Sequence, residues 1–136
     1  MYKSNFKKDL AYGKNYEVKA LKYFEYDVYE IKAGCFKPYD IIMKNKNGIL
    51  KVEVKSDRMA DKTGNLAIEY ECSGKPSGIS STQADVFMYF IKDDNNADIA
   101  YKIPTDELKK LVKGRYSVSG GDGCRARMYL LPYKNL

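Results

Sequence analysis

The dipeptide Asn47-Gly48 constrains the fold of this chain more than any other local feature, because it lies between two runs of alternating residues. Both residues tolerate positive φ, so the dipeptide predicts a two-residue β-hairpin turn. The turn would join one strand near 38–45 to a second near 49–56. Counting outward from it then fixes which side chains share a face of the sheet.

Three charged side chains fall on one face of this predicted hairpin. In this register Asp40 pairs with Lys55, and Glu53 becomes a diagonal neighbour of Asp40. Their Cβ atoms would be roughly 7–8 Å apart, a gap that two carboxylates can close around one cation. A three-residue turn would put Asp40 on the opposite face. A solvent-exposed strand is an alternative reading, because Lys51, Glu53 and Lys55 alternate with apolar residues.

A third carboxylate precedes the hairpin. Residues 4 to about 25 are expected to form an amphipathic helix, because apolar and small residues recur at the helical period. These are Phe6, Leu10, Gly13, Ala20, Leu21 and Phe24. Glu17 lies in the middle of this stripe. An ionised carboxylate on a core-facing surface is costly unless a cation meets it. Glu17 therefore either pairs with a lysine or contributes to a metal site.

Three segments together resemble the core motif of the PD-(D/E)XK nuclease superfamily, in particular the small Holliday junction resolvases and phage-encoded nucleases. They are Gly13-Lys14-Asn15-Tyr16-Glu17, Pro38-Tyr39-Asp40 and Glu53-Val54-Lys55. Tyr39 separates the proline from the aspartate, so the literal Pro-Asp dipeptide is absent. The resemblance covers residues 13 to about 90. It implies an α/β, restriction-endonuclease-like fold, a mixed central β-sheet flanked by α-helices.

The resemblance also implies an active site. Asp40, Glu53, the backbone carbonyl of Val54 and Glu17 would hold Mg²⁺, for which Mn²⁺ would substitute. A water bound to the ion would be the nucleophile, and Lys55 would lie beside that water or the scissile phosphate. These are the parts of a metal-dependent endodeoxyribonuclease, which hydrolyses DNA phosphodiester bonds.

The charge balance fits a polyanionic partner, since 24 basic and 18 acidic residues leave a net charge of +6. The Gly/Ser-rich segment 73–78 precedes a predicted short helix at about 80–84, whose N-terminus would offer backbone amides to a phosphate. Two arginines follow on a predicted strand at 125–131. The expected DNA contacts are Lys75, Ser77, Thr82, Gln83, Arg125 and Arg127. The alternatives are a plain connector for the loop and surface solubility for the arginines.

The other expected elements are strands and one further helix. Strands are predicted at 27–32, 65–72, 85–92 and 98–103, with polar loops at 57–64 and 119–123. A helix capped by Thr105 should end near Gly114. Glu69 and Glu71 share a face of their strand, where they either lie near the metal site or face solvent.

A length of 136 residues predicts one nuclease domain, residues 1–136, long enough to bury its own core. The chain lacks a membrane-spanning stretch and an apolar N-terminal signal region, which predicts an intracellular, cytoplasmic protein with no membrane partner. Cys35, Cys72 and Cys124 are odd in number and have no histidine partners. They are expected to be reduced thiols rather than disulfides or zinc ligands.

The sequence therefore predicts a Mg²⁺-dependent endodeoxyribonuclease that acts in DNA recombination on branched DNA such as a Holliday junction. The branched substrate is implied by the resemblance to stand-alone resolvases, which work as homodimers with two active sites. Two alternatives stay open. One is a restriction-like or nicking nuclease of phage origin, and the other is a DNA-binding module that has the same fold without activity.

Overall fold

A computed structural model describes residues 15–33, 38–120 and 125–136 of the chain. Several predicted features fall outside these residues. They are the stripe positions Phe6, Leu10 and Gly13, and the cysteines Cys35 and Cys124.

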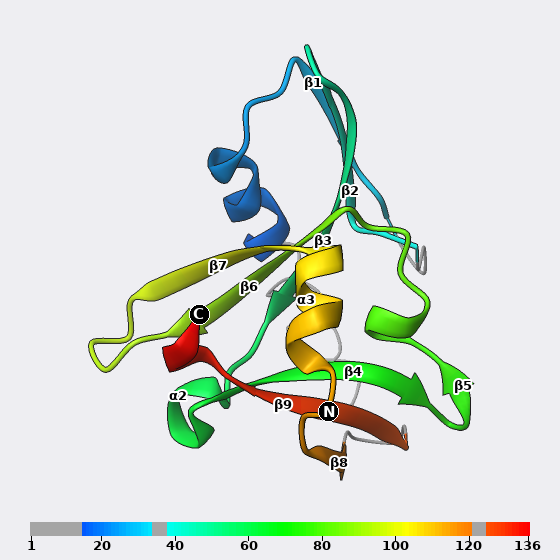
Figure 1. Ribbon diagram of the computed structural model, residues 1–136. Coiled ribbons are helices and arrows are strands. Elements are labelled where there is room, and N and C mark those ends of the chain that lie inside the picture. Colours follow the sequence, from blue (N-terminus) through cyan, green and yellow to red (C-terminus); the bar gives the residue numbers. More distant parts are fainter. Residues whose placement is uncertain (1–14, 34–37, 121–124) are drawn as a thin grey trace, which may run out of the picture.

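Strands dominate the structure and form two sheets, which makes it a mixed α/β fold (Figure 1). Sheet A is mixed, because β3 and β6 are parallel and its other neighbouring strands are antiparallel. Its order is β1 (Val28–Ile31), β2 (Ile41–Asn45), β3 (Gly48–Ser56), β6 (Val86–Lys92) and β7 (Asp98–Pro104). Sheet B is antiparallel, in the order β5 (Lys75–Pro76), β4 (Asn65–Cys72), β9 (Ala126–Pro132) and β8 (Ser117–Gly120).

The helices of the described residues are few and short. Residues 15–20 are α-helical and continue into the 3₁₀ turn η1 (Leu21–Tyr23). The others are α2 (Ala60–Thr63), η2 (Gly78–Ser80), α3 (Thr105–Val112) and η3 (Tyr133–Asn135). None of the helices in the described ranges has the length and apolar character that crossing a membrane requires.

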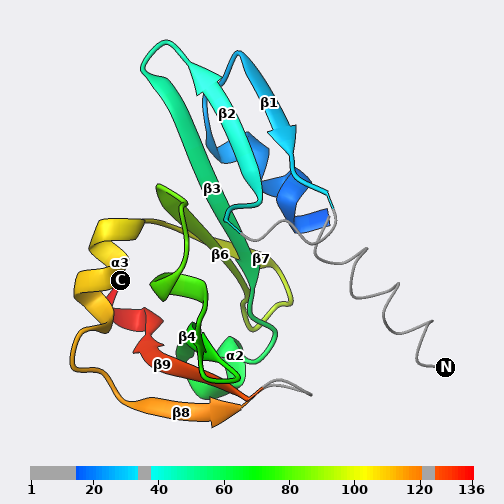
Figure 2. The same ribbon diagram turned by 90° about the vertical axis from the view of Figure 1, so that its right-hand side faces the viewer.

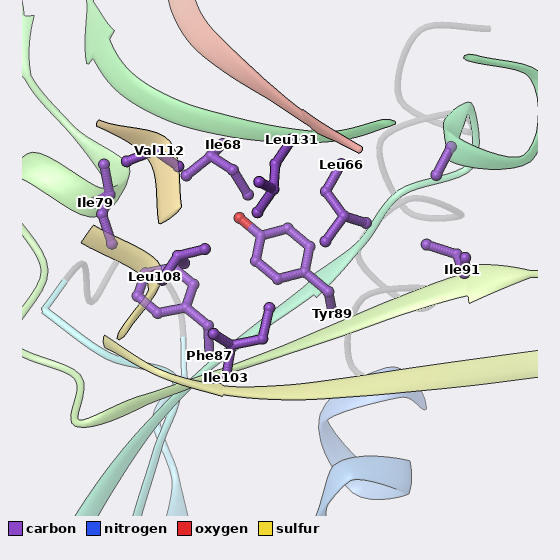
Figure 3. Packing of buried hydrophobic residues seen from close by; sticks show 11 residues of the cluster. Leu66, Ile68, Ile79, Phe87, Tyr89, Ile91, Ile103, Leu108, Val112 and Leu131 are labelled. Carbon is purple, nitrogen blue, oxygen red and sulfur yellow. The ribbon is translucent and has the colours of Figure 1, made fainter. Parts of the chain in front are cut away.

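Strand β6 lies at the centre of sheet A's contacts with both cores, and its residues 86–91 are all buried, as expected of a strand that is covered on both faces. Phe87, Tyr89 and Ile91 point into a core between sheet A and sheet B. Figure 3 shows Leu66, Ile68 and Leu131 of sheet B meeting these side chains, with Leu108 and Val112 of α3 closing the same core.

The opposite face of sheet A is covered by the helix at residues 15–20, drawn in blue in Figure 1. Tyr16 and Ala20 of this helix pack on Val52, Met88 and neighbouring side chains of sheet A. One face of sheet A is thus covered by a helix and the other mainly by a second sheet. The predicted arrangement, a single sheet flanked by helices, did not include sheet B.

A partly buried ionic contact holds this helix to β7. Asp98 accepts hydrogen bonds from the Tyr16 hydroxyl (2.9 Å) and from the ammonium group of Lys19 (2.8 Å), and it forms an ion pair with Lys92 (2.8 Å). Burial favours the neutral acid, but these hydrogen bonds outweigh it and hold the pKa of Asp98 well below its usual range.

The predicted helix at 80–84 is absent, and the 3₁₀ turn η2 ends at Ser80, the first residue of that range. Long-range hydrogen bonds replace the local ones. The amide of Gln83 donates to the Pro38 carbonyl (2.9 Å), and the amide of Asp85 donates to the Lys51 carbonyl (2.7 Å). The segment is therefore tied to the hairpin as extended chain.

The remaining expectations were mostly confirmed, with local corrections. The strands predicted at 27–32, 65–72, 85–92, 98–103 and 125–131 correspond to β1, β4, β6, β7 and β9. The polar loop at 57–64 contains α2, and β8 includes the start of the predicted loop at 119–123. Thr105 is the first residue of α3 rather than its cap, because its hydroxyl donates to the Ala84 carbonyl (2.8 Å).

Cys72, at the end of β4, is disulfide-bonded, so the expectation of a reduced thiol is wrong at this position. Its partner is not among the described residues. An odd number of widely spaced cysteines argues against a complete disulfide framework, but it does not exclude a single bond between two of them.

Candidate active site

The hairpin turn lies one residue earlier in the chain than predicted. The last paired residues are Asn45 and Gly48, so the turn consists of Lys46 and Asn47. The side-chain oxygen of Asn45 accepts a hydrogen bond from the Asn47 amide (2.8 Å), and positive φ falls on Gly48 (119°). A register change of two residues keeps each side chain on its predicted face of the sheet.

The two carboxylates of the hairpin meet where β2 begins. The Asp40 amide donates to the Val52 carbonyl (2.9 Å), which ties this residue to β3. One carboxylate oxygen of Asp40 accepts a hydrogen bond from the Val54 amide (2.7 Å). In the observed register Asp40 lies opposite Glu53, and the two carboxyl groups are close enough for Asp40 to raise the pKa of Glu53 through its charge and through hydrogen bonding. The predicted convergence of these two residues is confirmed, and they are closer than the predicted register implied.

Lys55 is the cation beside this carboxyl pair. Its ammonium nitrogen is 3.7 Å from one carboxylate oxygen of Glu53. The Lys55 side chain is 42% exposed, whereas that of Glu53 is 13% exposed. The lysine is therefore the more accessible of the two side chains and can reach a ligand, whereas the carboxyl group is largely shielded from solvent.

Burial raises the pKa of Glu53 from 4.5 to about 8. Lys55 opposes this increase, and the adjacent charge and hydrogen bond of Asp40 add to it. At neutral pH, with no cation bound, the folded protein keeps a proton on Glu53. A divalent cation bound between Asp40 and Glu53 would offset the cost of ionising Glu53, since it favours the ionised forms of both carboxylates.

The donor atoms of this site fit Mg²⁺, which prefers oxygen ligands. Asp40 and Glu53 supply carboxylate oxygens. The Val54 amide points toward Asp40, and the N–H and C=O of one residue lie on the same side of a strand. The Val54 carbonyl therefore also points to the Asp40 side, past the end of the ladder with β2. The predicted ligands Asp40, Glu53 and Val54 are thus adjacent.

Glu17 does not join this group. Its helix packs on the face of sheet A that carries Val52 and Met88. Glu53 and Lys55 are in register with Phe87 and Tyr89 of β6, whose side chains point to the opposite face. Within the described ranges, no three Asp, Glu, Cys or His side chains come together as a metal site. The apolar stripe indicated which side of the helix is buried, but not which face of the sheet it covers.

Two of the predicted DNA-contacting residues lie beside the carboxyl pair. The Gln83 amide is bonded to Pro38, two residues before Asp40, and the Gln83 side chain is exposed. The Thr82 hydroxyl donates to the same Pro38 carbonyl (3.4 Å) and accepts from the Ala84 amide (3.0 Å). Thr82 thus shapes the edge of the site, and Gln83 is available to a ligand.

The other predicted contacts lie farther along the same segment and on sheet B. Lys75 is exposed on β5, and the half-buried Ser77 has a hydroxyl that lacks a hydrogen-bond partner among the described residues. The phosphate site predicted for them loses its basis, because the helix N-terminus is absent. Arg125 and Arg127 are exposed and line an open cavity with Glu71.

This cavity, of about 670 Å³, also contains residues that the sequence did not suggest. They are Ser73, Gly74 and Ser119. They come together because β9 pairs with both β4 and β8, a contact between segments far apart in sequence. Glu69, which the prediction grouped with Glu71, is separated from it by an irregularity in the β4–β9 pairing. Alternation along either strand alone does not predict this pairing.

No protein-family model matches the chain, and no curated protein matches it.

Proposed function

We propose that this chain is a Mg²⁺-dependent endodeoxyribonuclease whose active site is formed by Asp40, Glu53, the Val54 carbonyl and Lys55. The observation that carries the proposal is the contact between Asp40 and Glu53, with the Lys55 ammonium group 3.7 Å from Glu53. Two half-buried carboxyl groups in contact are unfavourable when both are ionised, unless a cation binds between them. A partly exposed lysine at the same place suits a phosphate ligand.

The residues of the proposed site would have different roles in hydrolysis. Asp40, held by the Val54 amide, and Glu53, once it has lost its proton, would bind Mg²⁺. The ion would supply an activated water and neutralise charge on the phosphate. Lys55 would donate a hydrogen bond to a phosphate oxygen and stabilise the negative charge that develops there during hydrolysis. Glu17 is left out of this proposal, because its helix covers the other face of sheet A.

The arrangement of sheet A supports a restriction-endonuclease-like core within residues 15–92. A helix precedes three antiparallel strands, the carboxylates come from the second and third of these, and β6 runs parallel to β3. Sheet B would then be an addition to this core, inserted partly between β3 and β6 and completed by β8 and β9.

For the substrate we propose branched DNA, which a homodimer would cut in a resolvase-like reaction during recombination. The net charge of +6 supports a polyanionic partner. Gln83 at the edge of the site and the arginines of sheet B are the groups available to the arms of such a substrate.

The test is a cleavage assay with four-way junction, flap, nicked and linear DNA in Mg²⁺. Wild-type protein should nick the junction much faster than the matched linear duplex. Asp40→Asn, Glu53→Gln and Lys55→Ala should each lower the rate by at least about 100-fold, since each removes a group that stabilises the transition state. DNA binding measured in EDTA should change little.

Two matched variants serve as controls. Lys44→Ala removes an exposed lysine from β2 of the same hairpin, and Glu30→Gln removes an exposed carboxylate from β1. Both should retain wild-type cleavage. Full cleavage by Lys55→Ala would place the active site elsewhere, and equal rates on junction and linear DNA would reject the branched substrate. Binding without cleavage by any protein form would favour the DNA-binding module.

A further inference from the structure

The open cavity on sheet B contains two arginines that have no acidic partner among the described residues. Arg125 and Arg127 are two residues apart, so their side chains project from the same face of extended chain. In the parts of the chain that the structure describes, neither guanidinium forms an ion pair or a side-chain hydrogen bond. An arginine at a carboxylate usually forms a paired bond, so two unpaired guanidinium groups in one hollow indicate a binding site for an external anion.

Glu71 lies close to Arg127, and yet the two side chains do not form an ion pair among the described residues. Glu71 is the cross-strand partner of Arg127 on β4, and Ser119 is the partner on β8. An opposite charge was therefore available at the neighbouring position, yet it forms no ion pair with Arg127 among the described residues. The cavity keeps two cationic groups against one carboxylate, and the hydroxyl groups of Ser73 and Ser119 add neutral hydrogen-bond donors.

The cavity is connected to the candidate active site by one continuous segment. Ser73 and Gly74 line the cavity, and the chain then passes through β5 and η2 to Gln83, whose backbone amide is bonded to Pro38, two residues before Asp40. Figure 2 shows this green segment running from sheet B, below, to the β2–β3 hairpin, above. Residues 73–83 thus connect the cavity to the neighbourhood of the carboxyl pair.

We infer that this cavity is a phosphate-binding site for the DNA backbone, in which Arg125 and Arg127 hold a phosphate remote from the bond to be cut. This deepens the proposed function and rests on it for the identity of the substrate. A fork of guanidinium donors with hydroxyl groups beside it matches the tetrahedral oxygens of a phosphate. The carboxylate of Glu71 would repel the phosphate and so lower the affinity of the site.

The opposing signs of these charges make the test specific. Binding of a fluorescein-labelled four-way junction is measured by anisotropy in EDTA, at several salt concentrations. Arg127→Ala should weaken binding about tenfold. It should also reduce the slope of log K against log[salt] by about one, because one phosphate contact is lost. Glu71→Gln should tighten binding about threefold, because it removes a repulsive charge. If the two residues had only a structural role, both substitutions would weaken binding.

Arg115→Ala is the matched control, since it removes an exposed arginine that follows α3 and lies outside the cavity. It should bind like the wild type. Loss of binding in Glu71→Gln, or unchanged binding in Arg127→Ala, would overturn the inference. Because the assay runs in EDTA, its outcome is separate from cleavage. If Glu53→Gln abolishes cleavage but Arg127→Ala binds DNA like the wild type, the phosphate site in the cavity is rejected while the proposed active site is retained.

A second comparison identifies which phosphate binds. Single-stranded oligonucleotides with a 5′-phosphate or a 5′-hydroxyl should bind equally to the wild type if the site takes backbone phosphodiesters. A preference for the 5′-phosphate that disappears in Arg127→Ala would overturn the backbone assignment in favour of a terminal phosphate.

Discussion

The proton on Glu53 gives the sharpest test of the candidate active site. Its pKa in the folded protein is about 8, against 4.5 for an ordinary glutamate. Between these values the folded state binds more protons than the unfolded state, so the free energy of unfolding falls as pH rises, and this fall ends above pH 8. With these two values, the metal-free protein should lose about 2–3 kcal/mol through Glu53 between pH 6 and pH 9.

Glu53→Gln removes this titration and keeps the shape of the side chain. Urea unfolding of both proteins in EDTA should show the wild type becoming less stable relative to the variant as pH rises from 6 to 9. Adding Mg²⁺ at pH 9 should restore the wild type and have little effect on the variant, since ligands stabilise the state that binds them. Glu30→Gln, on exposed β1, is the control, and its stability should change with pH and with Mg²⁺ as that of the wild type does.

The same proton links metal binding to pH. Mg²⁺ must displace it, so the apparent affinity should rise about tenfold per pH unit below pH 8 and level off above it. Calorimetry in buffers of different ionisation enthalpy would detect the released proton. Parallel stability profiles of wild type and Glu53→Gln between pH 6 and pH 9, or a pH-independent Mg²⁺ affinity, would refute the reasoning.

Other predictions concern the framework. Asp98→Asn should lower the free energy of unfolding at pH 7 by about 1–3 kcal/mol. Because the pKa of Asp98 is lowered, the wild type should lose this advantage as pH falls below about 4, in urea titrations. Gly78→Ala should destabilise by about 2–4 kcal/mol, because a Cβ there would collide with the Glu69 carbonyl. Gly74→Ala, with positive φ but open space, should cost about 1 kcal/mol in the same unfolding assay. Alkylation of denatured protein should label one thiol before reduction and three after it, since Cys72 is disulfide-bonded; three labelled thiols before reduction would contradict this bond.

Local periodicity predicted most of the strands and the central feature of the site. The alternation around Glu53 and Lys55 and the turn residues at 47–48 were sufficient to place a hairpin there. The turn was misplaced because the Asn45 side chain stabilises a turn one residue earlier. The convergence of Asp40 with Glu53 survived this error, because the change in register was an even number of residues.

What the sequence could not predict depends on contacts between distant segments. The helix at 80–84 was expected from local signals, but the Gln83 amide bonds to Pro38 instead. The apolar stripe around Glu17 showed that one side of its helix is buried, yet either face of the sheet could have received it. Sheet B depends on β9 pairing with β4, which alternation along either strand does not reveal.

The order of strands in sheet B has a consequence for biosynthesis. Strand β4 belongs to the connection between β3 and β6, but its main partner, β9, is translated more than fifty residues later. On the ribosome, the β1–β2–β3–β6 part of sheet A could assemble against the N-terminal helix while β4 still lacked its neighbour. The core around Leu66 and Leu131 would close only after β9 had left the exit tunnel. Until then β4 would expose an unpaired edge, a site where nascent chains could associate with each other.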